Sequence, residues 1–302
     1  MIKRIRKDMK KYAGLYLLVI PVLLYYIIFC YVPLGGVSIA FLDYRPKAGI
    51  FGSEWVGLQH FKDLFTSSYF GRVLRNTLKI SLTQLILGFP APIVLALLIN
   101  ELKGKYFKRF VQTVSYLPHF VSLVIICAMV KEFVSTNGFI TQLLVDLFGI
   151  KKVSLLTNAD FYLPIHVISG IWATVGFGSI VFLAALSGIN TELYEAAKID
   201  GAGRFKQTLH VTLPGIAPTI IIKLILNIGS IMSLGHEKII LLYNEGIYET
   251  ADVISTYVYR KGLIDAEWSF STAVGLFNSV VNFVLVIIAN KVCAKVADVS
   301  LW

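Results

Sequence analysis

Few residues in this chain have the types and spacing that catalysis requires, and none of them form a convergent set. A hydrolase would need a Ser/His/Asp triad, a carboxylate pair or a histidine–metal cluster. The five histidines are scattered along the chain, and His119 and His166 are expected to be hydrogen-bonded packing residues. The three cysteines are widely separated and odd in number, which fits neither disulfides nor a metal site. We therefore expect packing roles for Cys30, Cys127 and Cys293.

Four residues have the chemistry of a sugar-binding site. Trp172 offers an aromatic face, while Asn227, His236 and Glu237 offer hydrogen-bonding groups. Small polar residues also hold membrane helices together, and tryptophan often marks a membrane interface. A packing role is therefore the alternative for each of these candidates for a substrate path.

The elements that must position these residues are long apolar helices. Of the 302 residues, 56% are hydrophobic and 15% are charged, against roughly a quarter charged in soluble domains. Five runs contain no Asp, Glu, Lys or Arg, and each reaches the ~20 residues that cross ~30 Å of hydrocarbon as a helix. These runs are 12–42, 80–100, 110–130, 161–191 and 268–290. A sixth span is predicted around 213–238, with Lys223 snorkelling or facing a cavity.

The fold class is therefore all-α, a polytopic membrane protein with about six transmembrane helices. The helices are predicted at 13–37, 77–100, 112–134, 162–188, 214–240 and 270–292. A basic segment, 1–12, precedes the membrane domain 13–292, and a short tail, 293–302, follows it. Proline and glycine inside several spans predict broken or kinked helices, which favours a transporter over a passive anchor.

The distribution of Lys and Arg sets the expected orientation. Lys and Arg are concentrated in the segment before the first span and in the loops after the second, fourth and sixth spans. In the other loops they are spaced more widely. Cytoplasmic loops carry this excess, so both termini are expected to be cytoplasmic. The net charge of +10 follows from the same bias. Nucleic-acid binding is not expected, because no concentrated basic surface with stacking aromatics lies outside the spans.

The segment 190–214 has the signals of a short capped helix in a cytoplasmic loop. Asn190 or Thr191 can cap its free N–H groups, and Glu192 with Glu195 lies in the first turns, where the helix dipole favours anions. Gly201 can end the helix in a left-handed conformation. The helix presents a face of small residues that includes Ala196 and Ala197. Such a face is typical either of a plain connector or of an element that docks on a soluble partner.

The motif in this loop resembles a known one. Glu195-Ala196-Ala197, Asp200-Gly201-Ala202 and Leu213-Pro214 resemble the EAA loop of binding-protein-dependent ABC importer permeases. The resemblance extends along almost the whole chain and is closest to maltose-type carbohydrate permeases, in the branch that handles oligosaccharides and polysaccharide fragments. Other similar segments are 55–61, 75–78, 115–120, 251–260 and 300–302.

The resemblance implies a type I ABC importer permease fold and a set of ATPase-coupling residues. Glu195 would bond to the ATPase, Ala196 and Ala197 would permit close approach, and Asp200 with Gly201 would complete the loop. The implied partners are a second permease, expected to be a homologous but different chain, two cytoplasmic ABC ATPases, an extracellular solute-binding protein and a saccharide. The implied location is the bacterial plasma membrane.

No cofactor is expected in this chain. It lacks a G-x-x-x-x-G-K-[S/T] phosphate loop, so ATP and Mg²⁺ are expected on the separate ATPase, and the chain is expected to be a transport subunit rather than an enzyme. An ion-coupled secondary transporter is the alternative. It would need ionisable residues within the spans and internal repeats, and only Lys223 lies deep in a span.

Overall fold

The computed structural model describes residues 11–302, which are mainly helical. They form two compact units. One contains the described residues up to Thr66 together with Arg260–Phe277, and the other contains Ser67–Tyr259 with Asn278–Trp302. The expectations for the basic residues 1–10 lie outside the described residues.

Six segments are candidate membrane spans. Five are continuous and apolar, at Ala13–Phe41, Phe70–Glu101, Ala159–Ser187, Arg204–Ile228 and Trp268–Ala297. The sixth is a pair of helices, Lys105–Phe120 and Leu123–Phe133, bent by 99° at the break between them. The prediction of an all-α polytopic fold with about six spans is confirmed.

The first unit combines the first span with a small two-stranded sheet. Leu42 of β1 lies opposite Trp55 of β2 in an antiparallel pair. The rings of Phe41 and Trp55 stack 5.5 Å apart, which fixes the end of the first span to the loop that follows it. The elements are α2 (Ala13–Tyr26), η1 (Ile27–Tyr31), η2 (Val32–Phe41), β1 (Leu42–Asp43), α3 (Gly49–Gly52), β2 (Glu54–Trp55), α4 (Gln59–Thr66) and η8 (Arg260–Ile264).

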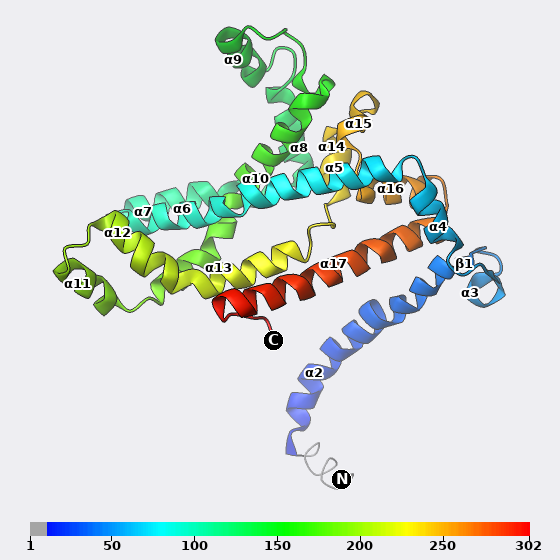
Figure 1. Cartoon of the computed structure of the whole chain (residues 1–302), viewed down its shortest axis with the longest axis horizontal. Helices are drawn as coiled ribbons and strands as arrows, with labels where there is room; N and C mark the ends of the chain where they lie inside the picture. Colours follow the sequence, from blue (N-terminus) through cyan, green and yellow to red (C-terminus); the bar gives the residue numbers. More distant parts are fainter. Residues whose placement is uncertain (1–10) are drawn as a thin grey trace. The chain divides into compact units, whose positions relative to one another are not determined.

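The second unit contains most of the spans, and in it α5, η3 and α6 continue one another as a single rod (Figure 1). The last helix, α17 (Trp268–Ala297), contributes its residues from Asn278 onward. The other elements are α5 (Phe70–Thr83), η3 (Gln84–Gly88), α6 (Pro90–Glu101), α7 (Lys105–Tyr116), η4 (Leu117–Phe120), α8 (Leu123–Phe133), α9 (Phe139–Phe148), η5 (Leu155–Thr157), α10 (Ala159–Ser187), α11 (Thr191–Ile199), α12 (Arg204–Gln207), η6 (Thr208–Thr212), α13 (Leu213–Ile228), α14 (His236–Leu242), η7 (Glu245–Ile247), α15 (Tyr248–Ala251) and α16 (Ile254–Tyr259).

Two predicted helices differ from the expectation. The one predicted at 112–134 breaks between η4 and α8, where Pro118 lacks an N–H donor and the Ser122 hydroxyl caps the new helix. The one predicted at 214–240 ends at Ile228, and the chain turns before α14 begins. The turn begins at Gly229, where a Cβ atom would collide with the Val286 side chain.

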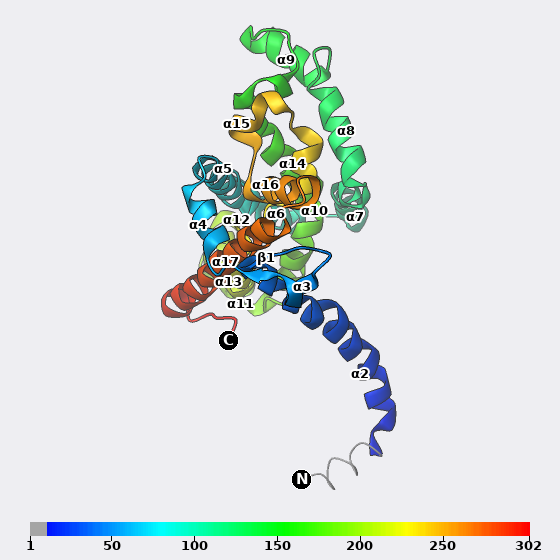
Figure 2. The same cartoon turned by 90° about the vertical axis from the view of Figure 1, so that its right-hand side faces the viewer.

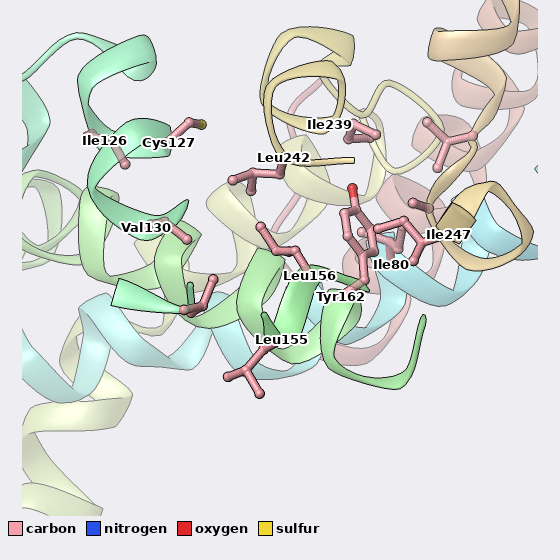
Figure 3. Close-up of a cluster of buried hydrophobic side chains, with 13 residues drawn as sticks. Ile80, Ile126, Cys127, Val130, Leu155, Leu156, Tyr162, Ile239, Leu242 and Ile247 are labelled. Carbon is pink, nitrogen blue, oxygen red and sulfur yellow. The ribbon is translucent and has the colours of Figure 1, made fainter. Parts of the chain in front are cut away.

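An apolar cluster of the second unit joins several short elements to the second and fourth spans. It combines residues of α5, α8, η5, α10, α14, η7 and α15 (Figure 3), and Figure 2 shows α8, α14 and α15 gathered on one side of this unit. Tyr162 and Ile239 are fully buried in it. The cluster holds α14 against α8 and α10, so it fixes the segment that follows the fifth span.

A buried polar network ties the start of the second span to α15 and α16. The Asn76 amide donates to the carbonyl oxygens of Glu249 at 2.8 Å and Asp252 at 3.0 Å. The Thr77 hydroxyl accepts the Ile254 N–H at 3.0 Å. These bonds satisfy backbone groups of a loop that would otherwise be buried without partners.

Replacing Asn76 by alanine is expected to destabilise the protein by about 1–3 kcal/mol, because one buried and one partly buried carbonyl group lose this donor. Thermal unfolding of the purified protein in detergent measures this loss. Thr83→Ala on the same helix is the control, since within the described residues the Thr83 hydroxyl bonds only to the carbonyl of Lys79 in its own helix. Equal stability of Asn76→Ala and Thr83→Ala would show that the network contributes nothing.

Candidate functional site

The helix predicted in the 190–214 loop is present as α11. The Asn190 side chain accepts the Glu192 N–H at 3.0 Å and is therefore its N-cap. Gly201 adopts the left-handed conformation with φ of +74°. The Ala202 N–H then bonds to the Ala197 carbonyl at 2.8 Å, which closes the helix end.

The helix α11 leaves most of the predicted coupling residues on the surface. Glu195, Ala196, Asp200 and Gly201 are exposed, and Ala197 is half-buried. Three large apolar side chains around them are uncovered as well, with exposed fractions of 52% for Leu193, 87% for Ile199 and 81% for Phe205. In Figure 1, α11 projects beyond the end of the rod at which α6 ends. Exposed apolar side chains gathered in this way are typical of a protein–protein contact.

Side-chain bonds hold the loop to its own unit. The Tyr194 hydroxyl lies 3.1 Å from the Thr212 hydroxyl at the start of the fifth span. The Gln207 amide donates to the Ala202 carbonyl at 2.7 Å. A push on α11 would therefore be transmitted directly to η6 and α13.

The predicted sugar-binding residues divide into two groups. Asn227 and Glu237 line a cavity of about 350 Å³, which we call the larger cavity. Trp172 is 43% exposed on α10 and does not line this cavity. The His236 ring stacks on Tyr259, with centroids 5.3 Å apart, and it also lies outside the cavity lining. The structure therefore brings together only Asn227 and Glu237.

A second cavity of about 230 Å³, the smaller cavity, is lined by Lys223 and shares Gln84 and Asn227 with the larger one. Both cavities lie among η3, α10 and α13 and are large enough together for a sugar ligand. Lys223 lines this hollow, which is one of the two placements that the sequence left open for it.

Two cavity residues were missed as site residues in the sequence. Lys238 lines the larger cavity from α14, a separate helix that begins after the fifth span has ended at Ile228. His166 also lines this cavity; it is buried as expected, but its Nδ1 atom has no partner in the described part of the chain. The available signals were a lone polar residue in an apolar stretch for His166, within α10, and the polar triplet His236-Glu237-Lys238 before an apolar run for Lys238.

The other histidine and the cysteines have simple environments. His119 is exposed and its ring stacks on Phe177 at a centroid distance of 3.9 Å. Cys127 is buried in the core, as predicted, whereas Cys30 is exposed. Within residues 11–302, no group of three or more His, Cys, Asp or Glu side chains is arranged to hold a metal ion.

Comparison with known proteins places this architecture in context. Residues 88–297 match the model of the family of binding-protein-dependent transport system inner membrane components. Protein LplB of Bacillus subtilis (strain 168) is 47% identical over 95% of this chain and 90% of its own length. The polygalacturonan/rhamnogalacturonan transport system permease protein YteP of the same organism is 43% identical over 99% of this chain and 94% of its own length.

A solved structure is similar over nearly the whole fold. It is a chain in the crystal structure of a bacterial alginate ABC transporter in complex with alginate pentasaccharide-bound periplasmic protein. The similarity covers 99% of this chain and 100% of that chain, with a TM-score of 0.90 and 42% sequence identity.

Proposed function

This chain belongs to the family of binding-protein-dependent transport system inner membrane components, and on that basis we propose that it forms the translocation path of an ATP-driven saccharide importer. The observation that carries the proposal is α11. A hydrogen bond between Tyr194 and Thr212 holds it to the fifth span, while its outer face has no cover within the described chain. An ATPase that closes against this face would move the spans behind it.

The proposal assigns partners and a location. Two cytoplasmic ABC ATPases would carry ATP and Mg²⁺ and would dock on α11 of this chain and the equivalent helix of a second permease. A solute-binding protein would deliver substrate on the opposite side of the bacterial plasma membrane. This requires both termini and α11 to be cytoplasmic, the orientation that the Lys and Arg distribution favours.

The substrate class rests on relatives and on the cavity. The relatives include proteins whose names specify polygalacturonan/rhamnogalacturonan and arabinooligosaccharides, and the similar structure contains alginate. In this chain, Asn227 and Glu237 line a hollow of sugar size and can hydrogen-bond to hydroxyl groups. Trp172 and His236 stay candidates only for a different point of the path.

Affinity purification of the full chain from its native membrane tests the assignment. An importer subunit is expected to bring stoichiometric amounts of an ABC ATPase and a second permease. The ion-coupled alternative expects a transporter that purifies and works without an ATPase. Absence of an ATPase in detergents that keep the membrane assembly intact would contradict the proposal.

Replacing Tyr194 by phenylalanine should weaken coupling without preventing assembly. The variant loses the hydroxyl pair with Thr212, which contributes about 1 kcal/mol, so substrate-stimulated ATPase activity should fall roughly fivefold. Thr208→Ala is the matched control, because in the part of the chain that the structure describes the Thr208 hydroxyl bonds only to the Arg204 carbonyl in the same helical stretch. An equal effect of Tyr194→Phe and Thr208→Ala would contradict a positioning role for Tyr194.

A further inference from the structure

The ammonium group of Lys238 is placed at the wall of the larger cavity, against α10. Its Nζ atom donates to the His166 carbonyl at 2.6 Å. Gly170, one turn further along α10, provides the space for this ammonium group, because a Cβ atom at that position would lie 3.0 Å from the Nζ atom. The lysine is half-buried and belongs to the cavity lining rather than to the outer surface.

Lys238 has hydrogen-bonding capacity that its own chain does not use. An ammonium group carries three donors, and one is occupied by His166. Among residues 11–302, Lys238 forms no ion pair with a carboxylate. A half-buried cation without a counter-charge is costly, which favours a site that an external anion completes.

The remaining charges of the two cavities reinforce this arrangement. Lys223 lines the smaller cavity, and the two hollows share Gln84 and Asn227, whose neutral amides suit hydroxyl and carboxylate oxygens alike. The one carboxylate of the lining is Glu237, which is exposed and is the neighbour of Lys238 in sequence. Adjacent helical residues project about 100° apart, and Glu237 forms no ion pair with Lys238. The lining therefore has two positive charges and one negative charge.

We propose that this path selects acidic saccharides, and that Lys238 binds a carboxylate of the sugar chain during passage. The inference rests on the proposed function and narrows its substrate class to oligosaccharides that contain uronic acids. Lys223 would provide a second cationic contact, reached past Gln84 and Asn227, so that successive carboxylates of a uronide chain meet positive charge along the path.

Uptake by cells that carry the full chain in its native assembly tests this. The probes are radiolabelled tetramers of galacturonate, mannuronate and glucuronate, each paired with its carboxyl-reduced neutral counterpart of the same linkage. Wild-type cells are expected to take up at least one uronide faster than its neutral counterpart. Lys238→Met should lower uptake of that uronide about tenfold or more, since a charged hydrogen bond is lost, and should change uptake of the neutral counterpart by less than about twofold.

Two further variants separate charge from structure. Lys238→Arg retains the cation and should retain most uronide uptake. Lys79→Met changes an exposed lysine of the same unit that lines neither cavity, and it should behave as wild type. Assembly of each variant is checked by the yield of co-purified partner subunits.

Each other outcome has a definite meaning. Faster wild-type uptake of neutral counterparts, or an equal loss of both probes in Lys238→Met, would overturn the selection of acidic saccharides and leave the importer assignment intact. Failure to take up any saccharide of the panel would count against the proposed function itself, and the inference would fall with it.

Discussion

Replacing Glu195 by alanine is expected to reduce substrate-stimulated ATPase activity of the assembly about tenfold or more. Glu195 is exposed on α11, and no residue of the described chain forms an ion pair with it. If it bonds to the ATPase, its loss removes a charged hydrogen bond, which contributes about 1.5–3 kcal/mol. The measurement is ATP hydrolysis by the purified assembly with and without saccharide-loaded binding protein.

The matched control is Glu192→Gln on the same helix. Glu192 is also exposed, but it lies in the first turn, where its carboxylate accepts a bond from the Asn190 amide at 3.1 Å. This variant should keep stimulation close to wild type. If Glu195→Ala also keeps full stimulation, or if both variants lose it equally, Glu195 has no specific role in coupling.

Replacing Gly176 by alanine should disrupt the crossing of α10 and α7. A Cβ atom at this buried glycine would collide with the backbone carbonyl of Ser115, which cannot rotate away as a flexible side chain can. Overpacking of this kind costs about 1–3 kcal/mol, and here the helices must also separate. The expected result is a lower unfolding temperature of the purified protein and a lower yield of assembled complex.

Gly188→Ala is the control for this prediction. Gly188 follows the same helix, and a Cβ atom there would lie 3.4 Å from the Ala185 carbonyl, an ordinary contact. This variant should unfold close to the wild-type temperature. Wild-type stability of Gly176→Ala would show that α7 and α10 are not packed as closely as the structure describes.

The parts of the site that depend on local signals could be predicted from the sequence. The ends of α11 follow from Asn190 and Gly201, because capping and left-handed glycine act within a few residues. Both features are confirmed. The roles of Glu195, Ala196 and Ala197 stay predictions, since they depend on a partner that is a separate chain.

The parts that depend on tertiary turns could not be predicted. Proline and glycine within the spans predicted that some helices are broken or kinked, but such residues do not fix where a helix ends or how sharply it bends, so the spans were predicted without the 99° bend that follows Pro118 and without the end of the fifth span at Ile228. The second of these errors hid the cavity. After the chain turns at Gly229, the ammonium group of Lys238 reaches the His166 carbonyl of α10. This contact joins residues that are 72 positions apart in the sequence.

Transport by the reconstituted assembly tests the central claim most directly. The full chain, with its co-purified partners, is placed in proteoliposomes, and uptake of labelled saccharide from loaded binding protein is followed. We predict uptake that requires ATP on the side of the ATPase subunits and that persists when ionophores collapse proton and sodium gradients. Uptake that proceeds without ATP and stops when an ion gradient is removed would contradict the account and establish an ion-coupled transporter.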